Sequence, residues 1–247
     1  MGGLAHYFEE EGLPTTQISL VRMHTEALKP PRALWVPFEF GRPLGVPNDI
    51  PFQTRVLQSV LKLFEASNGP VLEDFPEEAP VSDYAGTGWA CPVNLTKKET
   101  NLSSADPLRS AFKQEIIQLR SWYDLAVERR GRTTFGVSGL DIAAIGNFLG
   151  GFIGGSIPEN PRKDVPLGYM LRYAVDDLKA YYFEAVTAQP NQPSPESNQL
   201  ADWFWGETVA AQVILSIKES CASSDDELLQ TVSLMFLVPL DQLHRPA

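Results

Sequence analysis

The feature that most restricts the fold of this chain is a dense group of glycines and prolines between residues 41 and 49. The run Gly-Arg-Pro-Leu-Gly-Val-Pro at 41–47 has two glycines and two prolines within seven residues. It fixes an unusual backbone path, because proline locks φ and glycine adopts angles closed to other residues. An apolar segment at 33–38 precedes it, and Asn48 or Asp49 is suited to cap a helix beginning near Pro51. We therefore predict a buried strand, a fixed loop and a helix.

Residues upstream of this loop predict a second strand–helix unit. We expect a short helix over 4–11 that stops at Gly12, a strand over 15–21, and a loop with one helical turn over 22–29. A helix that stops at glycine and leads into a strand is typical of a parallel sheet. We expect the helix after the loop to run from 51 to 66 and to bury one apolar face, comprising Phe52, Val56, Val60, Leu61 and Phe64.

The loop at 41–49 is also the candidate binding site of this segment. In α/β sheets, ligands bind outside the carboxyl ends of strands, where helix N-termini attract carboxylates and phosphates. The candidate substrate-binding residues are Arg32, Arg42, Gly45 and Asn48, because arginine recognises carboxylates in bidentate fashion. The alternative is that the loop is a rigid connector and that both arginines are solvated or paired within the protein.

The order of these residues resembles a known family. The motif comprises Gly12, Leu13, Pro14 and Thr15, then Arg32 before an apolar strand ending at Pro37, then Pro43, Leu44, Gly45 and Pro47. In this order and spacing it resembles the glycine/sarcosine/betaine/D-proline reductase family, in particular its selenoprotein B-type subunit. The resemblance covers residues 4–65, about a quarter of the chain.

The resemblance implies an oxidoreductase that cleaves a C–N bond of a small amino acid or a betaine. In the family a selenocysteine or cysteine attacks the substrate, a dithiol system supplies electrons, and a separate subunit often carries a carbonyl cofactor. The reactive residue precedes the helix that leads into the Gly-Ile-Pro motif, whereas this sequence starts at that helix and has no cysteine before Cys91. We therefore expect a subunit or truncated homologue whose thiol or selenol is supplied elsewhere, or else a non-catalytic module that binds another protein.

Residues 67–105 read as an irregular Gly/Pro-rich loop or linker. This segment contains Cys91, between Trp89 and Pro92, which is the candidate catalytic thiol of the chain itself. A reactive thiol needs a cation, a histidine or a helix N-terminus to lower its pKa, and the nearest basic residues are Lys97 and Lys98. An inert, partly buried cysteine is the alternative. Cys221 follows an apolar helical run and is expected in the core.

Residues 106–247 predict a bundle of four or five helices. We expect helices over 106–130, 140–151, 164–188 and 198–220, and a last one from Asp225 and Asp226 to 237. A strand is expected over 133–137, with Ser138 capping the next helix. Glycines at 146, 150 and 154 predict close helix packing. Asp176, Asp177 and Glu207 are either inward-facing carboxylates or part of solvated helix faces.

The composition of the chain argues against several classes of function. The formal net charge of −11 argues against nucleic acid binding, which requires a basic surface. The two cysteines do not suggest a secreted disulfide framework, and the longest apolar run, 142–157, is too short to span a membrane, so we expect a cytoplasmic protein. His6 and Glu10 alone make no metal site, and we expect no metal or cofactor.

We therefore expect a partial parallel α/β sheet over 1–66, followed by a linker over 67–105 and a mostly α-helical domain over 106–247. The expected partners are a small amino-acid or betaine-like substrate and a protein subunit or second copy of the chain. An incomplete sheet leaves an edge strand that favours such association.

Overall fold

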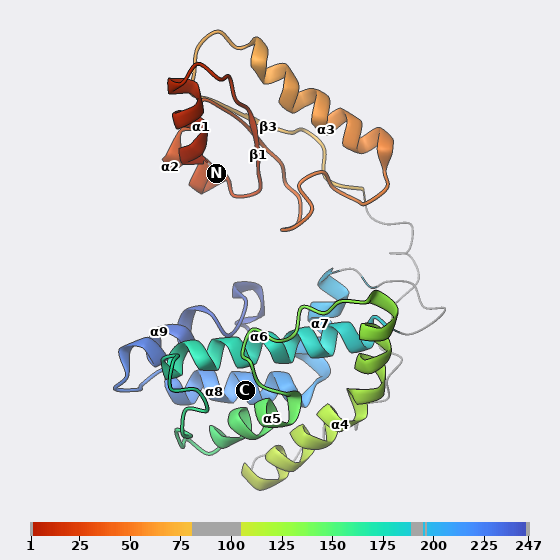
Figure 1. The fold of residues 1–247 in the computed structure, drawn as a ribbon, viewed down its shortest axis with the longest axis vertical. Helices are drawn as coiled ribbons and strands as arrows, with labels where there is room; N and C mark the ends of the chain where they lie inside the picture. The colour runs from red at the N-terminus through yellow and green to blue at the C-terminus, as the bar shows by residue number, and fades with distance from the viewer. Residues whose placement is uncertain (1, 81–104, 189–194, 196, 246–247) are drawn as a thin grey trace. The chain divides into compact units, whose positions relative to one another are not determined.

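A computed structural model describes residues 2–80, 105–188, 195 and 197–245. The chain divides into two compact units, residues 1–83 and 84–247, drawn in red to yellow and in green to blue in Figure 1. The first unit contains a small parallel sheet and the second is helical, as the sequence predicts.

The sheet of the first unit has three parallel strands in the order β1-β2-β3. They are β1 (Gln17–Ser19), β2 (Arg32–Trp35) and β3 (Val71–Asp74). The registers pair Ile18 with Leu34 and Leu34 with Glu73. β3 lies in the segment for which an irregular loop was expected. The acidic residues and prolines around β3 give no strand signal in the sequence, and the strand forms because its backbone pairs with β2.

Three α-helices accompany the sheet, which Figure 1 shows between α1 and α2 on one side and α3 on the other. They are α1 (Gly2–Glu10), α2 (Arg22–Leu28) and α3 (Ile50–Lys62), and α3 continues into a short 3₁₀ helix, η1 (Leu63–Glu65). Residues 22–29 were expected to form a loop with one helical turn, but the helix extends over nearly all of them and ends at Lys29, whose φ of 46° is left-handed and whose N–H donates to the Thr25 carbonyl.

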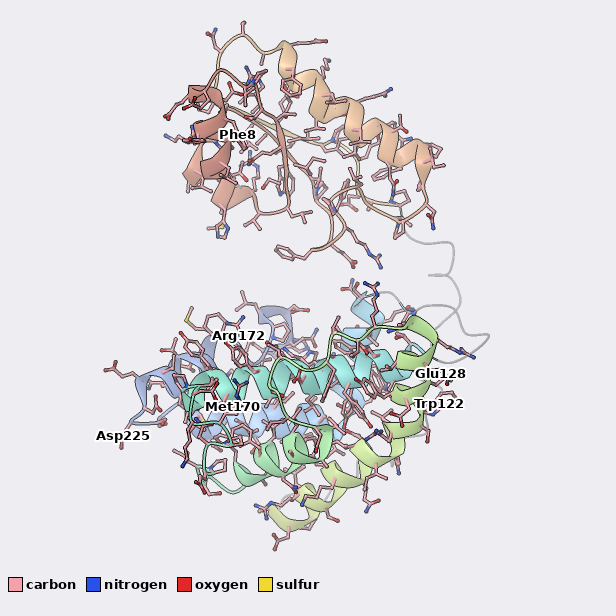
Figure 2. The ribbon with its side chains drawn as sticks, in the orientation of Figure 1. Phe8, Trp122, Glu128, Met170, Arg172 and Asp225 are labelled. Atoms are coloured by element: carbon pink, nitrogen blue, oxygen red, sulfur yellow. The ribbon has the colours of Figure 1, made fainter. Side chains whose placement is uncertain are left out.

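The core of this unit differs in part from the prediction. Phe52, Val56 and Val60 are buried against Leu34, as expected. Leu61 and Phe64 were also expected in the core, but 56% and 42% of their surfaces are exposed, and Leu63 is buried in their place. In α1 the large apolar residues Leu4, Tyr7 and Phe8 are likewise exposed (Phe8 is labelled in Figure 2). This helix buries its small residues Gly2 and Ala5 instead.

The second unit is organised around one long helix, α6 (Leu167–Val186), which packs against several of the other described helices. The first two are α4 (Ala105–Arg130) and α5 (Ile142–Gly151). After α6 come α7 (Ser197–Glu207), α8 (Val209–Cys221), α9 (Glu227–Met235) and a 3₁₀ turn, η2 (Leu240–Gln242). Their number exceeds the expected four or five because one predicted helix is divided.

The helix expected over 198–220 is interrupted at Thr208, because a buried carboxylate of α4 binds the backbone there. Glu115 is 2% exposed and accepts hydrogen bonds at 2.9 Å from the N–H groups of Val209 and Ala210. The hydroxyl of Tyr182, on α6, donates to the same carboxylate at 2.8 Å. A helix N-terminus favours negative charge, so Glu115 defines the start of α8.

Two acidic residues of α6 determine the loop between α4 and α5. Asp177 is fully buried and accepts hydrogen bonds from the N–H groups of Gly136, Val137 and Ser138 at 2.7–3.0 Å. Glu184 accepts bonds from the backbone and hydroxyl of Thr134, both at 2.7 Å. The strand expected over 133–137 is therefore wrong, since these N–H groups bind carboxylates instead of a neighbouring strand.

The start of α5 also differs from the prediction, because Asp141 caps it through the Ala144 N–H and Ser138 bonds to Asp177. The expected close packing near the helix glycines is confirmed at Gly146. A Cβ placed there would lie 3.0 Å from Ile116 on α4. Asp226 caps α9 as expected.

We predict that Glu184 makes the helical unit sensitive to acid. Burial raises the pKa of this carboxyl group, but the hydrogen bonds from Thr134 and Thr133 outweigh burial and hold the pKa below its ordinary value. Its stabilising contribution is therefore present above the unfolded pKa of about 4.3 and is lost as pH falls through the lower folded value. Urea unfolding followed by circular dichroism between pH 7 and 3 should show a smaller loss of stability in Glu184→Gln than in wild type.

The matched control is Glu128→Gln, which removes an exposed carboxylate of α4 (Figure 2) and should retain the wild-type pH dependence. If the stability of Glu184→Gln falls in parallel with wild type, the assigned role of this carboxylate is wrong.

Candidate functional site

The candidate site of the first unit is the carboxyl end of its parallel sheet, where ligands of α/β proteins bind. The last residues of the three strands, Ser19, Trp35 and Asp74, lie side by side in the sheet register. Arg22, the first residue of α2, donates from Nε to both carboxylate oxygens of Asp74, at 3.1 and 3.2 Å, and also pairs with Glu26. This end of the sheet therefore carries paired charges next to a half-buried tryptophan.

The loop at 41–49 follows β2 at this same end, and its shape is fixed by internal contacts. Gly45 has φ of +79° and its N–H donates to the Arg42 carbonyl at 2.9 Å. A Cβ at Gly45 would lie 2.5 Å from the ring of Phe52. The side-chain amide of Gln53 donates to the Val46 carbonyl at 2.9 Å. Gly45 is therefore buried and shapes the loop, and exposed Asn48 lies beyond it with a left-handed φ of 66°.

The start of α3 is occupied by the chain's own carboxylate. Asp49 caps the helix, and its Oδ1 accepts from the Phe52 N–H at 3.1 Å. Pro51 has no N–H to offer. An external carboxylate would compete with Asp49 for the remaining donors, so the helix start is less suited to an anion than the sequence suggests.

The two candidate arginines lie at opposite ends of β2, because Arg32 begins the strand and Arg42 follows its carboxyl end. Arg32 is 16% exposed and pairs with Glu9 at 2.7 Å. Its guanidinium also donates to the carbonyls of Thr15 and Ala66, at 3.4 and 3.5 Å. The substrate-binding role expected of Arg32 stays a prediction. The contacts that Arg32 makes in the structure connect α1 with the segments next to β1 and η1.

Glu9 is the counterion of Arg32. The Thr15 N–H donates to its carboxylate at 2.5 Å and, together with the Thr15 hydroxyl and Arg32, holds the pKa of Glu9 below its ordinary value. Arg42, in contrast, is 46% exposed and its described salt bridge is a longer contact of 3.5 Å to Glu39. Of the two arginines, Arg42 is the more accessible to a ligand.

The sequence did not indicate the pair of Arg22 and Asp74. Both residues lie in segments for which a loop was expected, and the contact depends on β3 joining the sheet. An arginine 52 residues before an aspartate is no sequence signal. Predicting the third strand from the sequence would have placed Asp74 at the same end of the sheet as Arg22.

The described residues contain neither a metal-binding cluster nor a membrane-spanning helix. Within the described residues, no cluster of three or more histidine, cysteine, aspartate or glutamate side chains is placed to bind a metal ion. His6 instead contacts the carbonyl of Leu28 at 3.0 Å. Among the same residues, no helix has the length and apolar character of a membrane span.

We predict that Gly45 is needed for the loop conformation. Alanine at a left-handed φ costs about 1–2 kcal/mol, and a clash with a buried ring adds about 1–3 kcal/mol. Gly41 is the matched control, because its φ is +85° and a Cβ there meets open space. Hydrogen exchange of peptides from residues 32–66 in increasing urea should show a larger destabilisation for Gly45→Ala than for Gly41→Ala. Equal effects would mean that the contact with Phe52 carries no energy.

We predict that Cys221 is unreactive in the folded protein. It is 2% exposed, and burial raises the pKa of its thiol to about 11 from 9.0. The reactive thiolate fraction at neutral pH is then lower by roughly 100-fold. Iodoacetamide labelling at pH 7.5 should modify Cys221 only after unfolding. Cys91 lies outside the described residues, and the same experiment tests it: labelling no faster than that of free cysteine would remove it as an activated nucleophile.

Comparison with known proteins gives no relative: no family model, no curated protein and no solved structure matches this chain. Its function is therefore inferred from its own residues and contacts.

Proposed function

We propose that this chain is a subunit or truncated homologue of a reductase of the glycine/sarcosine/betaine/D-proline type. In this proposal the α/β unit holds the carboxylate of a small amino acid or betaine, and a thiol or selenol supplied elsewhere cleaves the C–N bond with electrons from a dithiol. The chain contributes to the enzyme by binding and orienting the substrate.

One observation carries the proposal. The Gly/Pro loop that bears the family-like residues follows the carboxyl end of a parallel strand and is held in shape by Gly45 and Gln53. This arrangement leaves the guanidinium of Arg42 exposed at the end of the sheet where α/β proteins bind ligands. Arginine binds a carboxylate through two parallel N–H···O bonds, which suits an amino-acid or betaine carboxylate.

A second candidate function is a non-catalytic module that binds another protein. It is favoured by the groups that already occupy the expected substrate contacts, since Arg32 is paired with Glu9 and Asp49 caps α3. The two candidates differ in whether the chain binds a small zwitterion at all.

Ligand titration distinguishes them. The purified full chain is titrated calorimetrically with glycine, sarcosine, glycine betaine and D-proline, because binding does not require the catalytic thiol or selenol. The reductase proposal predicts that at least one of them binds. It also predicts that Arg42→Gln weakens that binding by about tenfold or more, the usual value of a charged hydrogen bond.

The matched control is Arg120→Gln in the helical unit. Arg120 is also exposed and paired with a nearby acid, Asp124, and its substitution should leave the affinity unchanged. No binding by any of the four compounds, or equal loss in the two variants, would exclude the proposed substrate contact and favour the protein-binding module.

A further inference from the structure

Among the residues that the structure describes, the first unit presents an unpaired sheet edge along β1. β2 is the central strand, so β1 and β3 form the two edges of the described sheet. The Val36 N–H donates to the Ser19 carbonyl, and backbone groups of alternate residues point to opposite sides of a strand. The N–H and C=O of Ile18 therefore point to the outer side of β1, where no described strand pairs with them.

The two edges differ in how well they resist pairing. β3 carries exposed Glu73 and Asp74, and Pro70 and Pro76 flank it. Charged residues and prolines are the usual protection of a natural edge strand. β1, with the sequence Gln-Ile-Ser, has no charge or proline. Only the β1 edge is thus suited to accept a further strand.

An exposed apolar stripe that runs along α3 into η1 lies on the side of β1. Arg55, on one flank of the buried face of α3, pairs with Glu77, which follows β3. Leu57 is turned from Arg55 by about 200° around the helix and lies on the opposite flank. The Thr16 hydroxyl, immediately before β1, donates to the Val60 carbonyl of α3 at 3.1 Å, which places this opposite flank beside β1.

The stripe consists of Leu57, Leu61 and Phe64, which are 43%, 56% and 42% exposed. Together with Ile50, which is 73% exposed, it follows a spacing of seven, four and three residues along the helix. A seam of this kind is typical of a helix that packs against another helix. The same side of the unit therefore offers both an open strand and an apolar helix flank.

We propose that the β1 edge and the α3 stripe form a two-fold interface between two copies of this chain. Across a two-fold axis at Ile18, β1 pairs antiparallel with the β1 of the second copy, and the two Ile18 residues exchange both backbone hydrogen bonds. The same axis places the two α3 helices antiparallel on one face of the continuous sheet.

The spacing of the stripe fits this symmetry, which identifies a second copy as the partner. Ile50 and Phe64 are each seven residues from Leu57, so antiparallel helices that cross at Leu57 bring Ile50 of each copy next to Phe64 of the other. An isologous interface requires such a patch, complementary to itself.

The net charge of the chain predicts how the dimer equilibrium depends on salt. Each chain has a formal net charge of −11, so two copies repel each other at long range. Salt screens this repulsion with a Debye length of about 10 Å at 0.1 M and about 3 Å at 1 M. Because the proposed contact is apolar and backbone-mediated, the dimer should strengthen as salt rises.

The test is sedimentation of the full chain at protein concentrations from about 1 to 100 μM, at low and high sodium chloride. We expect a monomer–dimer equilibrium that shifts to dimer with salt. Leu61→Lys should raise the dimer dissociation constant by at least about tenfold, because it places a charge in the apolar seam. The matched control is Ile117→Lys on α4 of the other unit, which is 63% exposed and should leave the equilibrium unchanged.

Hydrogen exchange supplies an independent measurement. The Ile18 amide should become more protected as protein concentration rises, and Leu61→Lys should abolish that dependence. The proposal is overturned by a wild-type chain that stays monomeric over this range of protein and salt concentrations. It is also overturned by a dimer that responds equally to Leu61→Lys and Ile117→Lys.

Discussion

Both units depend on the same constraint, which is that a charge removed from water must be paired or hydrogen-bonded. In the helical unit the carboxylates of Glu115, Asp177 and Glu184 are buried, and their partners are mostly backbone N–H groups that no helix would otherwise satisfy. In the α/β unit Arg32 takes the corresponding position, because its guanidinium joins Glu9 to two loop carbonyls. Leaving such a charge without partners costs more than its pairing gains, so these residues determine where the neighbouring segments lie.

This constraint also separates groups available to a ligand from groups that serve the fold. Arg32 and the N-terminus of α3 resemble substrate contacts in the sequence, yet Arg32 is paired with Glu9 and the helix start is capped by Asp49. Arg42 is exposed on a loop held by Gly45, so a ligand meets a preorganised loop with one accessible cation. Preorganisation lowers the entropy cost of binding, which is the physical basis for placing the proposed substrate contact there.

Local signals predicted much of the fold. The caps at Asp49 and Asp226, the stop at Gly12 and the start of the long helix near Asp106 depend on a few neighbouring residues, and the structure agrees with each of them within about a residue. Predictions failed where a distant residue decides the outcome. β3 forms because β2 offers it a partner, and the break at Thr208 exists because Glu115, almost a hundred residues earlier, binds the N-terminus of α8.

The sequence by itself determined the class of the fold, a partial parallel sheet followed by helices, and the existence of a rigid loop between the second strand and its helix. These follow from hydrophobic periodicity and from the restricted φ of glycine and proline, which are local properties. Only the tertiary structure decided that Arg32 pairs with Glu9 and that Leu61 and Phe64 face solvent. The first depends on the contact between α1 and the start of β2, and the second on which helix face meets the sheet, since α3 and η1 offer apolar residues on more than one face.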